Sequence, residues 1–166
     1  MSAIAIRHEA HGDEPAIHAL TAAAFRDMPF SDGDEQDLVD ALRRDGDLAL
    51  SLVAEDAHRI VGHIAFSAVS ISDGSSHWYD LGPVSVWPEV QRQGIGSALI
   101  RHGIAELRER GAHGIVLLGS PTYYARFGFE HDPQLAYPGT PPEYFQRLVL
   151  EGRPPRGIVK YPPAFG

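Results

Sequence analysis

The chain has 166 residues, of which 43% are apolar and 22% are charged, and this size and composition predict one folded domain rather than a disordered chain. Its formal net charge of −8 disfavours a broad nucleic-acid-binding surface. The absence of cysteine excludes disulfides, thiolate nucleophiles, zinc ribbons and iron–sulfur clusters. No apolar run reaches the roughly 18 residues of a membrane span, and residues 1–7 lack a secretory signal pattern, so we expect a cytoplasmic protein that binds neither nucleic acid nor membrane.

The first part of the chain predicts a strand, two helices and an antiparallel hairpin. Ile4 and Ile6 alternate with small or polar residues, as in a short strand. Asp13 is suited to capping the first helix, and Gly46 is suited to ending the second, acidic one. The expected elements in chain order are a strand over 3–7, helices over 13–25 and 34–44, and strands over 48–55 and 59–71.

The middle of the chain predicts an irregular strand followed by the longest helix. Gly82 and Pro83 interrupt the strand, because one lacks a Cβ and the other lacks an amide N–H, and such a pair suits a bulge or bend. The helix is expected to turn Ile95, Leu99 and Leu107 inward. The expected elements are strands over 78–86 and 114–118, the helix over 94–110, and a short helix over 121–127.

The last residues, 132–166, form a proline-rich extension with eight of the thirteen prolines. The extension also carries many large apolar side chains, among them Tyr137, Tyr144, Phe145, Ile158 and Tyr161. Because so many apolar groups are costly to leave in water, we expect loops and one or two strands packed on the same domain rather than a disordered tail.

A glycine-containing turn, Gln91–Ser97, lies where the irregular strand gives way to the long helix. The first amides of a helix have no partner within it and attract anions, and Gly94 and Gly96 leave room for a phosphate to approach them. Two glycines are also compatible with a simple tight turn. A dinucleotide-binding motif would need a third glycine where Leu99 stands, and a P-loop would need Gly-Lys-Ser/Thr, so both nucleotide motifs are disfavoured.

Two sequence blocks resemble the signatures of the GNAT superfamily of N-acetyltransferases. The first is Val-Ser-Val-x-Pro-x-x-Gln-x-x-Gly-x-Gly over 84–96, and the second is Tyr-Tyr-Ala-Arg-Phe-Gly-Phe over 123–129. The strong resemblance spans about Tyr79 to Phe129 and is similar to a branch of small predicted N-acetyltransferases. It implies a mixed α/β fold with a central mixed sheet, in which the parallel strands 78–86 and 114–118 splay apart, flanked by helices.

The resemblance also implies the position of the co-substrate, acetyl-CoA. Main-chain groups of the irregular strand would bind the pantetheine arm, and amides of the glycine turn would bind the pyrophosphate. The cofactor-binding residues expected on this basis are Val84, Ser85, Val86, Gln91, Arg92, Gln93, Gly94, Ile95, Gly96 and Ser97.

The resemblance implies two catalytic candidates, Tyr124 and Asp80. A lysine-like amine with a pKa of about 10.4 is neutral in only about one molecule in 2,500 at pH 7, so the acceptor needs a base, and Asp80 stands where some family members carry a carboxylate. Tyr124 would donate to the leaving thiolate, and an N–H of Val84 or Val86 could stabilise the carbonyl oxygen. Alternatively, Asp80 is a strand-entry residue facing water and Tyr124 is an ordinary core aromatic.

The sequence therefore predicts a single domain, 1–166, that moves an acetyl group directly to a primary amine of a small molecule or peptide. We expect no metal, because His8 and His11 are the only close histidine pair and the HExxH pattern is absent. The helix over 34–44 and the proline-rich ending are expected to border the acceptor. A non-catalytic acyl-CoA-binding or regulatory module remains the alternative, a dinucleotide-dependent oxidoreductase is a remote one, and the pattern allows a homodimer as well as a closed monomer.

Overall fold

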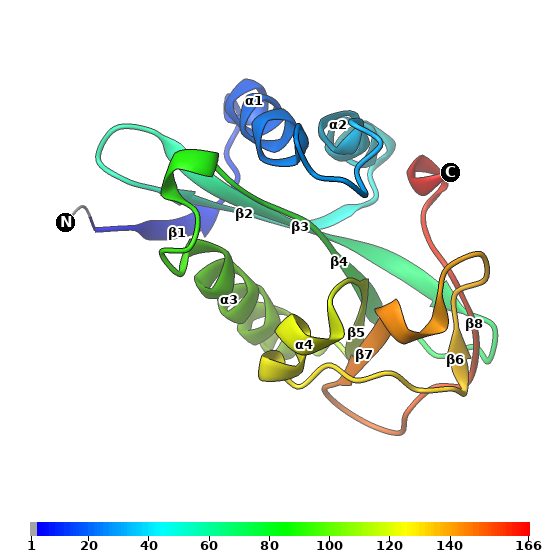
Figure 1. Cartoon of the computed structure of the whole chain (residues 1–166). Helices are drawn as coiled ribbons and strands as arrows, with labels where there is room; N and C mark the ends of the chain where they lie inside the picture. The colour runs from blue at the N-terminus through cyan, green and yellow to red at the C-terminus, as the bar shows by residue number, and fades with distance from the viewer. Residues whose placement is uncertain (1–2) are drawn as a thin grey trace.

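The computed structural model describes residues 3–166, and Met1 and Ser2 lie outside the described residues. It is a mixed α/β fold built on an eight-stranded sheet with the order β1-β2-β3-β4-β5-β7, beside which β8 pairs with β3 and β6 (Figure 1). The strands are β1 (Ala5–His8), β2 (Leu48–Glu55), β3 (Ile60–Ile71), β4 (Trp78–Val86), β5 (Gly114–Leu118), β6 (Leu135–Ala136), β7 (Phe145–Val149) and β8 (Gly157–Lys160).

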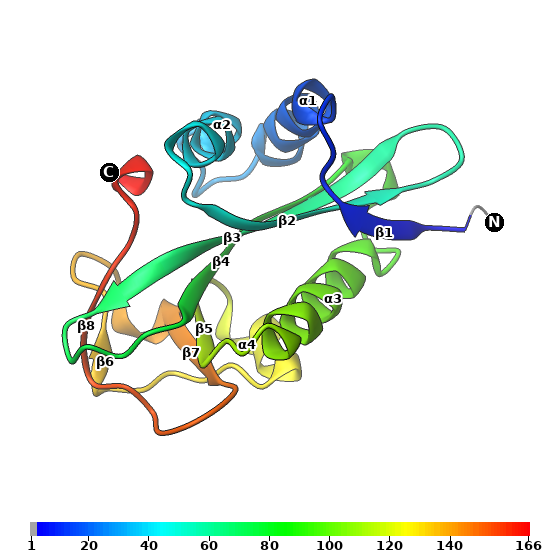
Figure 2. The ribbon, with the colours of Figure 1, turned by 180° about the vertical axis from the view of Figure 1, so that it is seen from behind.

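The helices cover both faces of the sheet. Figures 1 and 2 show α1 and α2 on one face and α3 and α4 on the other. The helices are α1 (Glu14–Phe25), α2 (Glu35–Asp45), α3 (Ile95–Glu109) and α4 (Pro121–Tyr124), with short 3-10 helices over Pro88–Val90, Ala125–Phe127, Pro142–Tyr144 and Pro163–Phe165. Among residues 3–166, no helix is long and apolar enough to cross a membrane. The expected elements are confirmed to within about two residues, except that the short helix over 121–127 divides into α4 and a 3-10 turn.

The face covered by α3 holds the main core. Ile95, Leu99 and Leu107 are almost completely buried there, as their helical spacing predicts. A Cβ at Gly103 would overlap the ring of Phe66 on β3, so glycine at this position lets helix and sheet approach closely. The long helix therefore has a fixed place on the sheet, which also fixes the position of its N-terminus.

The expected capping role of Asp13 is wrong. No side-chain hydrogen bond from Asp13 caps α1. Its carboxylate instead accepts hydrogen bonds from Arg7 Nη1 at 2.8 Å and from the amide of Ala10 at 2.7 Å. The ion pair with Arg7, which also binds Glu55, draws the carboxylate towards β1 and away from the helix amides.

The parallel strands β4 and β5 separate after a short shared stretch. They pair from Trp78 opposite Gly114 to Asp80 opposite Val116, and no further pair follows. On its other side β4 stays paired with β3, but the register shifts at Gly82 and Pro83, as the sequence predicts for a bulge. The bulge turns β4 away from β5 and opens a wedge between them, which confirms the expected splayed sheet.

The proline-rich extension supplies part of the sheet. β7 pairs antiparallel with β5, and β8 pairs with the end of β3. The rings of Tyr137 and Tyr161 stack with centroids 4.3 Å apart and an interplanar angle of 13°. The expectation that the large apolar groups pack holds for most of them, but Tyr144, at the end of a 3-10 helix, and Ile158, on β8, are 46% and 53% exposed.

Candidate active site

The N-terminus of α3 presents free backbone amides. Gly94 precedes the helix in the left-handed region at φ 84°, and its carbonyl accepts from the amide of Ala98. Within residues 3–166, the amides of Ile95, Gly96 and Ser97 have no hydrogen-bond partner, and no side chain caps this end. These donors, together with the helix dipole, make a site for an anion.

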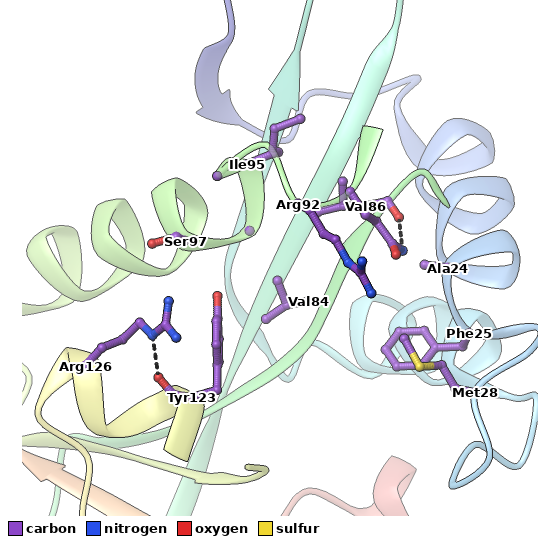
Figure 3. A pocket seen from close by; sticks show the side chains of 13 residues that line it. Ala24, Phe25, Met28, Val84, Val86, Arg92, Ile95, Ser97, Tyr123 and Arg126 are labelled. Atoms are coloured by element: carbon purple, nitrogen blue, oxygen red, sulfur yellow. Dashed lines mark hydrogen bonds between the residues drawn. The ribbon is translucent and has the colours of Figure 1, made fainter. Parts of the chain in front are cut away.

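A cavity of about 590 Å³ begins at these amides and runs along β4. Figure 3 shows Phe25 and Met28 of the α1 side on one wall, Tyr123 and Arg126 on the other, and Val84 between them. Two cations face this space, Arg92 from the glycine turn and Arg126 from beyond α4. The residues lining it are Ala24, Phe25, Met28, Val84, Val86, Gln91, Arg92, Gly94, Ile95, Gly96, Ser97, Tyr123 and Arg126.

The main chain of β4 faces this cavity with polar groups that no neighbouring strand pairs. The amide of Trp87 donates to the carbonyl of Val61 on β3 at 3.0 Å. Because backbone groups alternate along a strand, those of Val84 and Val86 point to the opposite side, where β5 no longer pairs. The Val86 carbonyl accepts from Gln91 Nε2 at 3.0 Å. An extended ligand in the cavity can therefore add to β4 in the manner of a strand.

Eight of the ten expected cofactor-binding residues line the cavity, and Ser85 and Gln93 do not. Ser85 is 1% exposed, and its hydroxyl lies 3.4 Å from that of Thr21 on α1. The reason is the alternation of side chains along β4, which sends Val84 and Val86 to one face and Ser85 to the other.

A second cavity of about 710 Å³ joins the first. Phe25, Met28 and Val84 line both, so the two spaces meet at the bulge of β4. Asp80 and Tyr124 line the second cavity. Its remaining lining residues are Phe30, Ser31, Glu35, Leu38, Leu81, Gly82, Pro83, Leu118, Gly119, Ser120, Tyr137, Thr140, Tyr161 and Phe165. Residues of α2 and of the proline-rich extension thus border this space.

Asp80 does not face water, so the alternative that Asp80 is a solvent-facing residue at the entry of the strand is wrong. The residue is 3% exposed, and burial raises the pKa of its carboxyl to about 7. The nearby hydroxyl of Tyr161 acts in the opposite direction and lowers the pKa of Asp80, although no hydrogen bond of normal geometry joins the two groups. A carboxyl with this pKa accepts and releases a proton near neutral pH.

Tyr124 lies at the end of α4 against the second cavity. The hydroxyl of Ser120 accepts from the amide of Tyr123, which fixes the start of this short helix. A Cβ at Gly119 would lie 2.6 Å from the Tyr124 ring, so glycine there gives the ring its space. Burial raises the pKa of Tyr124 to about 12, with smaller contributions from Tyr123 and Asp80. The phenol therefore stays protonated and can donate a hydrogen bond.

Several lining residues were not expected from the sequence. Phe25 is the last residue of α1 and Met28 follows it, and both come into the site only because α1 packs across β3 and β4. Arg126 belongs to the second sequence block, and this position could have marked it as a cofactor-binding candidate. Its guanidinium lies 4.5 Å from the ring of Tyr123. Tyr161 reaches Asp80 from the end of the chain, and no local pattern indicates that contact.

Among residues 3–166, one group of side chains could hold a metal ion, and it lies outside both cavities. Ligand atoms of His18, Asp37 and Asp40 are within 4.8 Å of one another on the surface of α1 and α2. His18 Nδ1 already lies 2.7 Å from Asp40 Oδ2. Of the close sequence pair His8 and His11, His8 places its Nε2 2.7 Å from Glu106 Oε1. None of these residues lines either cavity.

Comparisons with known proteins show which family the chain is similar to. A family model described as an acetyltransferase (GNAT) domain matches residues 5–131. The chain is 39% identical over 140 residues to a protein of Escherichia coli K12 named uncharacterized N-acetyltransferase YhbS, covering 81% of each chain. It is 41% identical over 105 residues to a second protein of that strain, uncharacterized N-acetyltransferase YjhQ, covering 61% of this chain and 58% of the relative.

Two crystal structures share the fold over nearly the whole chain. A GNAT family acetyltransferase from Brucella melitensis, in complex with acetyl-CoA, has a TM-score of 0.89 and 45% identity over 100% of both chains. YhbS from Escherichia coli, in complex with CoA, has a TM-score of 0.87 and 35% identity over 99% of this chain and 93% of that one. The resemblance found in the sequence is thus confirmed: the chain belongs to the GNAT family and is an acetyltransferase.

Proposed function

We propose that the protein transfers the acetyl group of acetyl-CoA directly to a primary amine. The observation that carries this proposal is the junction of the two cavities at Val84. One cavity ends at the free amides of α3, and the other contains Asp80 and Tyr124. A donor lying in the first cavity can thus bring its thioester to the junction, where an acceptor in the second can attack it.

The first cavity suits acetyl-CoA in shape and in chemistry. The pyrophosphate would lie on the amides of Ile95, Gly96 and Ser97, with Arg92 and Arg126 supplying positive charge. The pantetheine arm contains amides, and these would pair with the open main-chain groups of β4. The complexes of the two related structures, with acetyl-CoA and with CoA, support this arrangement.

Asp80 is the proposed base for the acceptor amine. The pKa of its carboxyl, about 7, is roughly three units above that of an exposed aspartate. This difference makes proton transfer from an ammonium group less unfavourable by about 4 kcal/mol. The neutral amine nitrogen then attacks the thioester carbon, and an N–H of Val84 or Val86 stabilises the oxygen that becomes negative.

Tyr124 is proposed to stabilise the leaving thiolate by hydrogen bonding. When the C–S bond breaks, the sulfur takes the electron pair and becomes the thiolate of CoA. A complete proton transfer from Tyr124, whose pKa is about 12, to a thiolate with a conjugate pKa of about 8.5 is uphill by about 5 kcal/mol. The hydrogen bond avoids this cost. As the amide forms, the nitrogen loses its second proton to solvent, and the thiolate takes up one proton from solvent.

The proposed function is tested by following release of the CoA thiol with acetyl-CoA and a panel of primary amines. We expect steady amine-dependent release that Asp80→Asn lowers at least about 100-fold. A non-catalytic module would bind acetyl-CoA and release no thiol with any amine. Binding measured by calorimetry on the same samples separates a silent binding module from a protein that does not bind acetyl-CoA.

A further inference from the structure

The second cavity carries charge of one sign only. Asp80 and Glu35 are its ionisable acids, and among the described residues that line it there is no lysine, arginine or histidine. An acceptor with a carboxylate beside its amine would bring that carboxylate close to Asp80 with no cation to offset it. Like charges in a site of low dielectric repel strongly.

The two acids are not equivalent. Glu35 already accepts a hydrogen bond from Ser31 Oγ at 2.6 Å and is only half-buried. Asp80 is 3% exposed and has no charged partner. At the buried end of the cavity, Asp80 is thus the single carboxylate available to pair with one positive charge.

The walls around that place are apolar and aromatic. The apolar lining residues are Phe25, Met28, Phe30, Leu38, Leu81, Pro83, Val84, Leu118 and Phe165. Phe30 is 90% exposed and stands at the edge of the cavity, where a ligand could cover it. A second ammonium group among these walls would lose its water without gaining a buried counter-ion.

Hydroxyl groups complete the surroundings of Asp80. Its charge contributes to the raised pKa values of Tyr124, Tyr137 and Tyr161, so all three rings lie within range of one carboxyl. The Tyr161 hydroxyl is buried without a hydrogen-bond partner among the described residues. So is the hydroxyl of Ser67, which stands directly across from Asp80 on β3. A bound ammonium has three N–H donors, one for the carboxylate and two for the tyrosine oxygens that line the cavity.

Building on the proposed function, we infer that the acceptor is a primary amine with a single positive charge and an apolar aromatic or alkyl body. Its ammonium group lies between Asp80 and the surrounding hydroxyls, and its body lies against the apolar walls and Phe30. Amino acids bind poorly because their carboxylate would lie near Asp80 without a cation to pair with it. Polyamines bind poorly because their further ammonium groups would lose water without gaining a buried counter-ion. Tyr137, Thr140, Tyr161 and Phe165 lie outside the stretch 5–131 that the family model matches, so the proline-rich extension contributes to the selectivity.

The test uses pairs of amines that differ in one group. We expect 2-phenylethylamine to exceed phenylalanine, which differs from it by one carboxylate, by at least about tenfold in kcat/KM. We expect hexylamine to exceed 1,6-diaminohexane, which adds one ammonium group, by a similar factor. Thiol release that favours phenylalanine or the diamine overturns the inference and leaves the proposed function intact. No release with any of these four amines, while another amine of the panel is acetylated, overturns the inference alone. No release with any amine, while acetyl-CoA binds, overturns both.

A pair of variants tests the role of the cavity wall. Phe30→Ser should lower kcat/KM for 2-phenylethylamine about tenfold and leave the Kd for acetyl-CoA unchanged. Ile158→Ser is the matched control, because Ile158 is also an exposed apolar residue and lines neither cavity, and it should leave both quantities unchanged. Equal kcat/KM values for the two variants would contradict the proposed position of the amine body.

Discussion

Asp80 lies opposite Val116 in the last parallel pair before β4 and β5 separate. Val116 is fully buried, and Asp80 is 3% exposed, so the carboxyl group is held at the apex of the wedge between the strands. The same geometry that opens β4 to a ligand also removes Asp80 from water. The proposed base and the proposed donor site thus have a common structural origin in the bulge at Gly82 and Pro83.

Asp80→Asn tests the base by its pH dependence. A base acts when it is deprotonated, so kcat/KM of the natural protein should rise as the pH increases through about 7, the pKa of Asp80. The variant keeps the shape of the side chain but cannot accept a proton, and it should lose both that rise and at least about 100-fold in kcat/KM. The Kd for acetyl-CoA should not change. If the variant retained the same rise of kcat/KM with pH, a group other than Asp80 would be responsible for it.

The stability of the fold should also depend on Asp80. Its pKa is about 7 in the folded protein and about 3.9 in an unfolded chain, so the folded state holds the proton more tightly. The protonated carboxyl therefore adds to the free energy of unfolding. This stabilisation is complete below about pH 4 and is lost as the pH rises to about 7, a change of up to about 4 kcal/mol. Urea unfolding across this range should show that the natural protein loses stability relative to Asp80→Asn as the pH rises. Parallel curves for the two proteins would contradict the raised pKa.

Tyr124→Phe should lower kcat by about ten- to a hundredfold with little change in the Kd for acetyl-CoA, because the hydroxyl acts on the thiolate that forms during reaction. The measurement is thiol release at saturating amine, with calorimetry for binding. Tyr144→Phe is the matched control, since Tyr144 is 46% exposed and lines neither cavity. Equal kcat for Tyr124→Phe and the control would remove the hydroxyl from the mechanism.

Gly94→Leu tests the free amides of α3. Gly94 has φ 84° and open space around its missing Cβ, so a side chain would be strained and would lie over the turn that presents these amides. Gly74→Leu is a close control, because Gly74 has φ 86°, equally open space, and a place in a turn outside the cavities. The free energy of unfolding should fall by a similar amount in both variants, about 1 to 2 kcal/mol. Only Gly94→Leu should weaken acetyl-CoA binding, by about tenfold or more, and equal Kd values for the two would exclude the assigned phosphate site.

The order of elements could be read from the sequence because each depends on local chemistry. Gly46 ends α2 in the left-handed conformation, and the Gly82-Pro83 pair marks the bulge. The glycine turn before α3 has the open amides that its two glycines predict. In contrast, Asp13 was expected to cap α1 and instead binds Arg7, because a neighbouring strand offers a charged partner that the local pattern does not contain.

The sequence by itself determined the helix N-terminus with its anion site, the irregular strand, and the two blocks that identify the family, since backbone preferences and periodicity act over a few neighbouring residues. Only the tertiary structure decided that Asp80 is buried, that Ser85 faces α1, and that Tyr161 from the end of the chain reaches the same carboxyl. The physical reason is that burial and electrostatic environment depend on which distant segments pack together. Here, the extension closes one side of the cavity, while the end of α1 closes the other.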